Sequence, residues 1–218
     1  MFGFHFDPLL IAINIPVFLI SLSFHELLHG YTAYKFGDST AKYDGRLSLN
    51  PFRHIDPIGF ILMIVWQFGW AKPVMVNIRN LKNPKKDMAL IALFGPVANI
   101  ILAFASLLIY HPLAYLFKGN VPDLLSLFFS QLFFINLSLA LFNLIPLPPL
   151  DGSKIMSSFI PLKYYFRYME IERYGFIILI ILILTGVVGK ILGPLMFGKY
   201  GVYAGMSFLV DKIYFFLN

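Results

Sequence analysis

The sequence predicts an all-α protein that crosses a lipid bilayer several times. Of its 218 residues, 59% are hydrophobic and only 13% are charged, and the mean hydropathy is +0.77. A soluble domain of this size does not need so much apolar surface. At about 20 residues for each crossing, the length accommodates a bundle of roughly five to six transmembrane helices with short connections. We therefore expect one integral-membrane domain over residues 1–218, with no separate soluble domain.

The apolar stretches place the helices along the chain. Four stretches are long enough to span the bilayer, and they cover Pro8–Phe36, Met88–Tyr110, Asp123–Asn143 and Gly175–Leu192. The last stretch, Gly193–Asn218, contains several glycines and charged residues, and indicates either a weak span or a helix at the membrane surface. The apolar piece Ile58–Phe68 is too short to cross, and basic loops flank it, so we expect a re-entrant or interfacial segment.

Two short segments near the predicted cytoplasmic face alternate in polarity as strands do. They are Arg46–Leu49 and Val74–Asn77, and they predict a small β-hairpin or sheet. The free edge of such a sheet could accept an unwound peptide as an added strand.

The basic residues are sorted by loop, which predicts the orientation of the chain. The formal net charge is +6, and nine of the 17 basic residues lie within Lys35–Lys86, with four more within Lys154–Arg173. In the segment His111–Asp123, Lys118 is the only Lys or Arg residue. By the positive-inside rule, the two basic regions are cytoplasmic and the third region lies on the opposite side. Because the charge follows the topology, we do not expect a nucleic-acid partner.

Two absences narrow the possible chemistry. Neither Lys nor Arg precedes the first apolar stretch, so we do not expect a removable signal peptide. The chain contains no cysteine, which excludes disulfides and thiolate ligands. Any metal ion must therefore be bound by His, Asp or Glu.

A polar cluster interrupts the first predicted span, with the sequence His25-Glu26-Leu27-Leu28-His29. Residues four apart share a face of a helix, so both imidazoles can bind one Zn²⁺ while Glu26 faces water at the metal. A charged side chain near mid-membrane costs about 2.5 to 3.5 kcal/mol, and a bound cation would compensate for it. The pattern is typical of a metal-assisted peptide hydrolase. The alternative is a polar helix end at the membrane surface that carries three unrelated residues.

A catalytic zinc usually takes three protein ligands, so a third ligand must come from elsewhere in the chain. Position 35, where a metzincin carries its third histidine, is Lys35. The remaining candidates are His5, His54, His111, Glu170, Glu172 and the aspartates. His5 and His111 are predicted on the opposite side of the membrane, whereas Asp151 follows the inner end of the third span. Three prolines break the helix before Asp151. Irregular backbone at membrane depth is tolerated only where the protein or a water-filled cavity satisfies its polar groups, as it would in a buried metal site. Asp151 could alternatively cap the next helix, and the two roles are compatible.

Further motifs accompany the two histidines, and together they carry a family resemblance. These motifs are Gly37 through Ala41, Gly45 through Pro51, His54 through Gly59, Ala71 through Val74, Gly95 through Asn99, and Asn143 through Gly152. With His25 through Gly30, they make the chain resemble the site-2 proteases, a family of intramembrane zinc metalloproteases. The resemblance is to the compact bacterial or archaeal form without PDZ or CBS domains. The C-terminal third of the chain matches only in hydropathy.

The resemblance implies roles for five residues. His25, His29 and Asp151 would bind one Zn²⁺ per chain, and Glu26 would act as the general base in peptide hydrolysis. Asn143 stands eight residues before the aspartate and would hold the substrate or the developing oxyanion.

Two other polar residues have both an ordinary and a functional interpretation. His54 is either an exposed loop histidine or a reversible cover over the zinc. Asn99 belongs either to a close-packing helix kink that begins at Gly95 or to the surroundings of the site, where it would contact substrate or gate access.

The burial of the predicted site indicates membrane-embedded substrates, and the sorting of charge indicates its orientation. We expect an endopeptidase that cleaves within or near transmembrane segments of other membrane proteins, with its active site toward the cytoplasmic side of the cell membrane. Its partners would be those substrates and the bilayer, and a homo-oligomer is left open. The main alternative is a zinc-binding transporter or metal-sensing protein that uses the same ligands without hydrolysis. Glu26 distinguishes the two, because only the protease needs it as a base. A catalytically silent scaffold that binds membrane segments is a weaker alternative, because the motif residues are intact.

Overall fold

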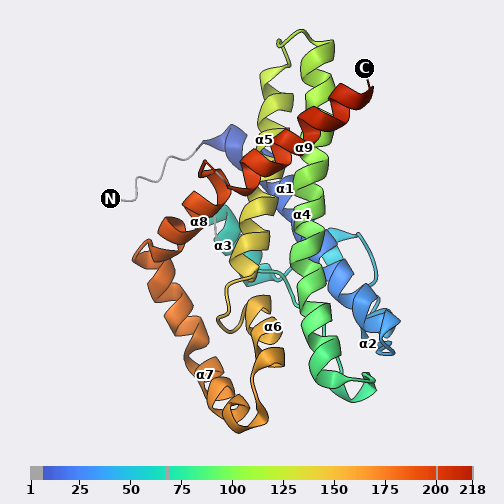
Figure 1. Cartoon of the computed structure of the whole chain (residues 1–218), viewed down its shortest axis with the longest axis vertical. Helices are drawn as coiled ribbons and strands as arrows, with labels where there is room; N and C mark the ends of the chain where they lie inside the picture. Colours follow the sequence, from blue (N-terminus) through green and yellow to red (C-terminus); the bar gives the residue numbers. More distant parts are fainter. Residues whose placement is uncertain (1–6, 67–68, 200, 218) are drawn as a thin grey trace.

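Three long helices dominate the structure, a computed structural model that describes residues 7–66, 69–199 and 201–217. They are α1 (Pro8–Lys35), α4 (Pro84–Leu116) and α5 (Asp123–Asn143), and each is long and apolar enough to cross a membrane. Helix α4 packs against both α1 and α5 (Figure 1). The predicted third span is confirmed with the same bounds, whereas α4 extends beyond both ends of the predicted second span. The chain is therefore an all-α membrane protein.

Local sequence signals fix both ends of α1. The Asp7 carboxylate accepts hydrogen bonds from the backbone N–H groups of Leu9 and Leu10, and Pro8 occupies the first helical position, where a missing N–H costs nothing. After Phe36, the backbone turns at Gly37 with φ +108°, a value that favours glycine. The helix therefore ends one residue before the predicted bound.

Short elements connect α1 to α4. In chain order they are α2 (Thr40–Tyr43), η1 (Pro51–Arg53), α3 (Pro57–Trp66) and η2 (Ile78–Asn80). The ten residues of α3 rise about 15 Å, half of the hydrocarbon thickness. This agrees with the prediction that this piece does not cross. The end of the predicted segment, residues 67–68, lies outside the described residues.

The predicted β-hairpin or sheet does not form within the described part of the chain. Neither Arg46–Leu49 nor Val74–Asn77 is a strand, and the only β pairing described is an isolated antiparallel bridge between Ile55 and Ala71. The reason lies in the partners of the backbone. The N–H groups of Val74 and Asn77 donate to the carboxylates of Glu26 and Asp38 instead of a neighbouring strand.

The C-terminal part differs from the predicted spans. It contains α6 (Asp151–Phe159), α7 (Leu162–Leu184), α8 (Val187–Phe197) and α9 (Val202–Leu217). The predicted span Gly175–Leu192 is broken at Gly186, where φ is +73° and the helices on either side bend by 71°. The described residues therefore supply three spans, or four if the bent pair is one span, fewer than the five to six expected from length.

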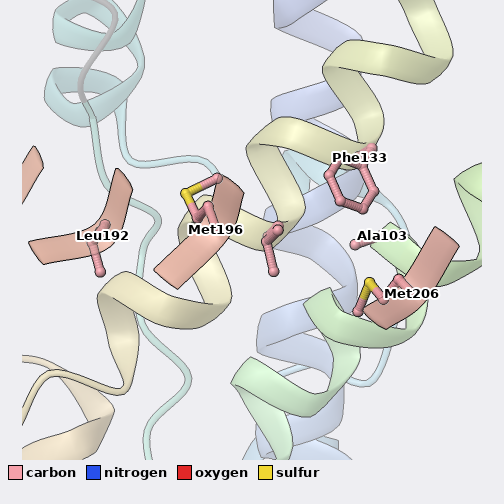
Figure 2. Packing of buried hydrophobic residues seen from close by; sticks show 6 residues of the cluster. Ala103, Phe133, Leu192, Met196 and Met206 are labelled. Atoms are coloured by element: carbon pink, nitrogen blue, oxygen red, sulfur yellow. The ribbon is translucent and has the colours of Figure 1, made fainter. Parts of the chain in front are cut away.

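One apolar cluster joins the C-terminal helices to the long ones. It consists of Ala103, Phe133, Leu137, Leu192, Met196 and Met206, which come from α4, α5, α8 and α9 (Figure 2). A second cluster of Ala33, Leu81 and Ile91 ties α1 to the start of α4. Between them, the long helices bury polar groups against one another, including His25, Asn99 and Asn136.

Candidate metal centre

Three electron-pair donors meet where α1 approaches the start of α6. His25 Nε2 and His29 Nε2 each lie 3.1 Å from Asp151 Oδ2, and the two nitrogens lie 3.0 Å apart. All three residues are buried, and within the described residues they are the one group of His, Asp or Glu side chains arranged to hold a metal ion. A tetrahedral zinc with bonds of about 2.0 Å places its ligand atoms roughly 3.3 Å apart. The three residues therefore fit zinc.

The opposite ring nitrogens show which tautomer each histidine adopts. His25 Nδ1 lies 2.7 Å from Asn99 Oδ1, and His29 Nδ1 lies 2.7 Å from the carbonyl oxygen of Ile91. Both partners can only accept, so each imidazole donates from Nδ1 and keeps the lone pair on Nε2. This is the form that ligates a metal.

Asn99 is itself held in one orientation. Its amide nitrogen donates to the carbonyl of Ser21 at 3.1 Å and to Asn136 Oδ1 at 2.9 Å, which turns Oδ1 toward His25. Asn136 in turn donates to the carbonyl of Leu132. Asn99 and Asn136 are fully buried. The structure therefore places Asn99 behind a ligand, and its predicted contact with substrate remains untested.

Gly95 provides the space for both imidazoles. A Cβ atom at this position would lie 2.4 Å from the His29 ring and 2.7 Å from the His25 ring. The helix α4 can approach α1 this closely only without a side chain there. The close-packing interpretation of this motif therefore agrees with the structure, and the close packing makes room for the two candidate ligands.

The proline-rich loop brings Asp151 to the histidines. Asp151 is the first residue of α6 and makes no capping hydrogen bond, because the N-cap position is Leu150. Its Oδ2 faces the imidazoles, and Lys154 Nζ lies 3.5 Å from its Oδ1. A Cβ at Gly152 would lie 2.3 Å from the carbonyl oxygen of Leu144, so the loop folds tightly against this turn.

Glu26, next to His25 on α1, is buried and has a defined partner. Its Oε2 accepts the backbone N–H of Val74 at 2.8 Å. Val74 belongs to the segment Ala71–Asn77, which is neither helix nor strand and contacts α1 through this bond. One carboxylate oxygen is therefore held by the protein backbone.

The other predicted site residues lie apart from this cluster. Asn143 is the last residue of α5, and its amide nitrogen donates to Leu139 of the same helix. His54 is buried and not an exposed loop residue, and its Nε2 donates to the Ser48 carbonyl at 2.8 Å. His111 pairs with Asp211 at 3.2 Å. His5 lies outside the described residues.

Sequence patterns did not reveal three of the groups around the candidate ligands, and at Gly95 they indicated close packing but not the groups that pack there. The Ile91 carbonyl and the Val74 N–H are backbone groups, and Gly95 acts through the absence of a side chain. Asn136 bonds to Asn99, which in turn bonds to the candidate ligand His25. The one available signal was that buried amides in a span require partners.

A largely apolar cavity of about 720 Å³ lies beside the site-bearing helices. Its walls come from α1, α3, α5, α7 and α8, and include Phe18 and Phe142 together with the polar side chains of Asn14, Gln131 and Ser138. Phe18 precedes His25 by two helical turns on the same face, and Phe142 adjoins Asn143. The cavity therefore extends along the same two helices that carry His25 and Asn143.

Comparison with known proteins identifies the family. The protein named "Putative zinc metalloprotease YwhC" of Bacillus subtilis is 43% identical over 181 residues, which cover 82% of this chain and 83% of that protein. The chain belongs to peptidase family M50, the site-2 protease family. The model of this family matches residues 111–186.

More distant relatives carry similar names. "Putative zinc metalloprotease MJ0611" of Methanocaldococcus jannaschii is 34% identical over 154 residues, covering 66% of this chain and 72% of that protein. "Putative zinc metalloprotease Rip2" of Mycolicibacterium smegmatis is 26% identical over 201 residues, covering 88% and 74%. No solved structure matches the chain. Family membership and the apolar helices together make this M50 peptidase an intramembrane zinc metalloprotease.

Proposed function

We propose that this M50 peptidase cleaves peptide bonds within or near the transmembrane segments of other membrane proteins, using one Zn²⁺ per chain. The observation that carries the proposal is the convergence of His25 Nε2, His29 Nε2 and Asp151 Oδ2 at 3.0–3.1 Å, with Glu26 beside them on α1. The whole of residues 1–218 would act as one membrane-embedded catalytic domain.

The residues of the chain divide the work of hydrolysis. When bound to His25, His29 and Asp151, zinc would polarise the scissile carbonyl and acidify water toward a pKa of about 7. Glu26 takes the proton of the attacking water on Oε1, while its Oε2 keeps the Val74 N–H. Glu26 then delivers that proton to the leaving amine. Asn143 would turn its amide from Leu139 to donate to the developing oxyanion.

The cavity beside α1 and α5 supports a membrane-embedded substrate. Its volume of about 720 Å³ is that of a ligand pocket, and its apolar wall suits the side chains of a transmembrane segment. Polar groups such as Asn14 and Gln131 could bind backbone groups that a substrate exposes when it unwinds for cleavage. His54 would act on access rather than chemistry, because it contacts Ser48 and no ligand residue.

The charge distribution supports an active site toward the cytoplasmic side. The basic regions Lys35–Lys86 and Lys154–Arg173 flank the end of the bundle where α1 and α5 finish, while Lys118 stands alone in the loop between α4 and α5. The bilayer is then a partner in its own right. A homo-oligomer is compatible with this arrangement.

Glu26→Gln provides the central test. In a purified preparation, we expect cleavage of a model transmembrane substrate to fall by about a hundredfold or more, the usual size of a general-base contribution. Zinc content should stay at the wild-type level, because Glu26 is not a ligand. His25→Ala is the matched control and should lose zinc and cleavage together.

The same variant separates the protease from the rival zinc transporter or sensor. Family membership favours the protease. Undiminished cleavage by Glu26→Gln would overturn the proposed mechanism. Loss of zinc from Glu26→Gln would show that the carboxylate acts as a ligand.

A further inference from the structure

The segment Ala71–Asn77 is held against the catalytic helix by single hydrogen bonds and not by a sheet. Its N–H groups at Lys72, Val74 and Asn77 donate to the His54 carbonyl at 2.8 Å, to Glu26 Oε2 at 2.8 Å and to Asp38 Oδ2 at 2.7 Å. The Val74 N–H, which lies between the other two donors, is the backbone partner of Glu26, the proposed general base. The position of this N–H therefore depends on the contacts at Lys72 and Asn77.

Asp38 is a fixed anchor because its other oxygen is fully engaged. Oδ1 accepts the Thr40 N–H at 3.1 Å, the Thr40 hydroxyl at 2.6 Å and the Asn80 amide at 2.8 Å. Asp38 is fully buried, and its backbone N–H donates to the carbonyl oxygen of Ala33 in the last turn of α1. Oδ2 is left for the Asn77 N–H. Asp38 therefore links the end of α1 to the segment that touches Glu26.

The balance of effects on Asp38 favours the charged carboxylate. Burial alone would raise the pKa of this group, but the hydrogen bonds from Thr40, Asn80 and Asn77 outweigh burial and hold the pKa below its ordinary value. A charged acceptor makes stronger and shorter hydrogen bonds than a neutral one. The contact with Asn77 is thus stronger than a simple loop contact.

We propose that Asp38 is a positioning residue for peptide hydrolysis, which anchors Asn77 so that the Val74 N–H holds Glu26 in its working orientation. This inference rests on the proposed role of Glu26. Val74 lies only three residues from Asn77. If the contact between Asn77 and Asp38 is lost, the Val74 N–H can therefore move away from Glu26 Oε2. A misplacement of about 1 Å in a catalytic group can cost about a hundredfold in rate.

Asp38→Asn tests this link with little disturbance. Three donors surround the position of Oδ1, so the amide oxygen of the new asparagine takes that position. The NH₂ group of the asparagine then takes the position of Oδ2 and faces the Asn77 N–H. Two donors then face each other, so that single contact is lost. We expect kcat to fall about tenfold to a hundredfold with KM within about twofold, because the loosened contact acts on the proposed base and not on ground-state binding.

Two further measurements on the same protein distinguish positioning from general damage. Zinc per chain should remain at the wild-type value, because no ligand contacts Asp38. Amide hydrogen exchange at Val74 and Asn77 should become faster, while exchange in α4 stays unchanged. Asp44→Asn is the matched control, since it makes the same change at an exposed carboxylate six residues along the chain, and its kcat should stay close to wild type.

A second pair of variants removes the donor and leaves Asp38 intact. Asn77→Pro deletes the N–H at an extended position that proline tolerates, and should lower kcat as Asp38→Asn does. Asn77→Ala keeps the N–H and loses only the side chain, so it should retain most of the activity. This pair tests the proposal even if Asp38→Asn does not fold.

Each outcome decides the matter. Wild-type kcat in Asp38→Asn or Asn77→Pro would overturn the positioning role, and so would equal losses in Asn77→Pro and Asn77→Ala. Zinc loss in the folded Asp38→Asn protein would also overturn it in favour of a structural role. If Glu26→Gln still cleaves, the proposed function fails; if Glu26→Gln is inactive and Asp38→Asn is not impaired, only the present inference fails.

Discussion

The amide of Asn99 controls how His25 presents Nε2, the proposed ligand nitrogen. Asn99 Oδ1 accepts from His25 Nδ1 at 2.7 Å, and its amide nitrogen is fixed by Ser21 and Asn136. The tautomer with a lone pair on Nε2 is therefore set before any metal arrives. Groups of this kind typically change metal affinity by about 10- to 100-fold when removed.

Asn99→Ala should therefore weaken zinc binding by about 10- to 100-fold. The substitution removes the acceptor for His25 Nδ1, so the imidazole can rotate or take the other tautomer. Competition with a chelator of known affinity measures the change. Ser106→Ala is a control on the same helix, because the Ser106 hydroxyl bonds only to its own helix at Ala103. Equal zinc affinity in wild type and Asn99→Ala would contradict this account.

Gly95→Ala should weaken the site by crowding the ligands. The added Cβ would lie 2.4 Å from the His29 ring, and overpacking of this kind costs about 1–3 kcal/mol. Because the strain falls on both imidazoles, zinc affinity should drop about tenfold or more. Zinc per chain after dialysis measures the effect. Gly193→Ala, where nothing lies within 4 Å of the new Cβ, should keep its zinc.

The convergence of the three candidate ligands could be predicted from the sequence, because each is a side chain with a sequence signal. Four-residue spacing on one helix predicted His25 and His29, and topology together with the proline-rich break predicted Asp151. The environment of His54 was not predictable, since its burial arises from loop packing far from any periodic pattern. At Gly95 the sequence indicated close packing, but it could not show that the packed groups are the rings of His25 and His29.

At the scale of elements, hydropathy predicted long helices well and local irregularities poorly. The span Asp123–Asn143 has no internal break and was placed correctly, whereas Gly186 interrupts an apolar run without changing its composition. The alternating segment Val74–Asn77 does not form the predicted strand, because carboxylates from α1 and the following turn accept the N–H groups of Val74 and Asn77. A pattern of period two thus does not show which groups the backbone will bind.

The turn after α1 should lose stability in acid in a way that Asp38 explains. Because the folded pKa of Asp38 lies below its ordinary value of about 3.9, its stabilising contribution is complete above that value. The contribution is lost as pH falls through the lower, folded pKa. The Tm of wild type should therefore exceed that of Asp38→Asn near neutral pH, and the gap should narrow below about pH 4.

Thermal unfolding of both proteins between neutral and acidic pH checks this expectation. Asp44→Asn is the control, since Asp44 is exposed and its replacement should leave the Tm difference small at every pH. A gap between wild type and Asp38→Asn that stays constant through the acidic range would show that the Asp38 contacts do not depend on its charge.

At the scale of the whole molecule, the two ends of the bundle differ in charge and in content. Helices α1 and α5 end on the side of the bundle that carries Asp151 and α6. The basic region Lys35–Lys86 begins at the end of α1, and the basic region Lys154–Arg173 follows α5 in the chain. The loop that joins α4 to α5 contains Lys118 alone. By the positive-inside rule, this distribution supports our proposal that the candidate metal centre lies nearer the cytoplasmic surface.

Single-cysteine labelling tests this orientation directly, because the chain has no cysteine of its own. Tyr43 and Tyr115 are 86% and 84% exposed. Tyr43 is the last residue of α2 and Tyr115 lies in the last turn of α4, and these two helix ends lie toward opposite ends of the bundle (Figure 1). With a membrane-impermeant maleimide, Tyr115→Cys should be labelled in intact cells, and Tyr43→Cys only after the membrane is opened. The unsubstituted protein is the control for background. The reverse pattern would place the metal centre toward the outer surface, and the source of its substrates and zinc would have to be sought there.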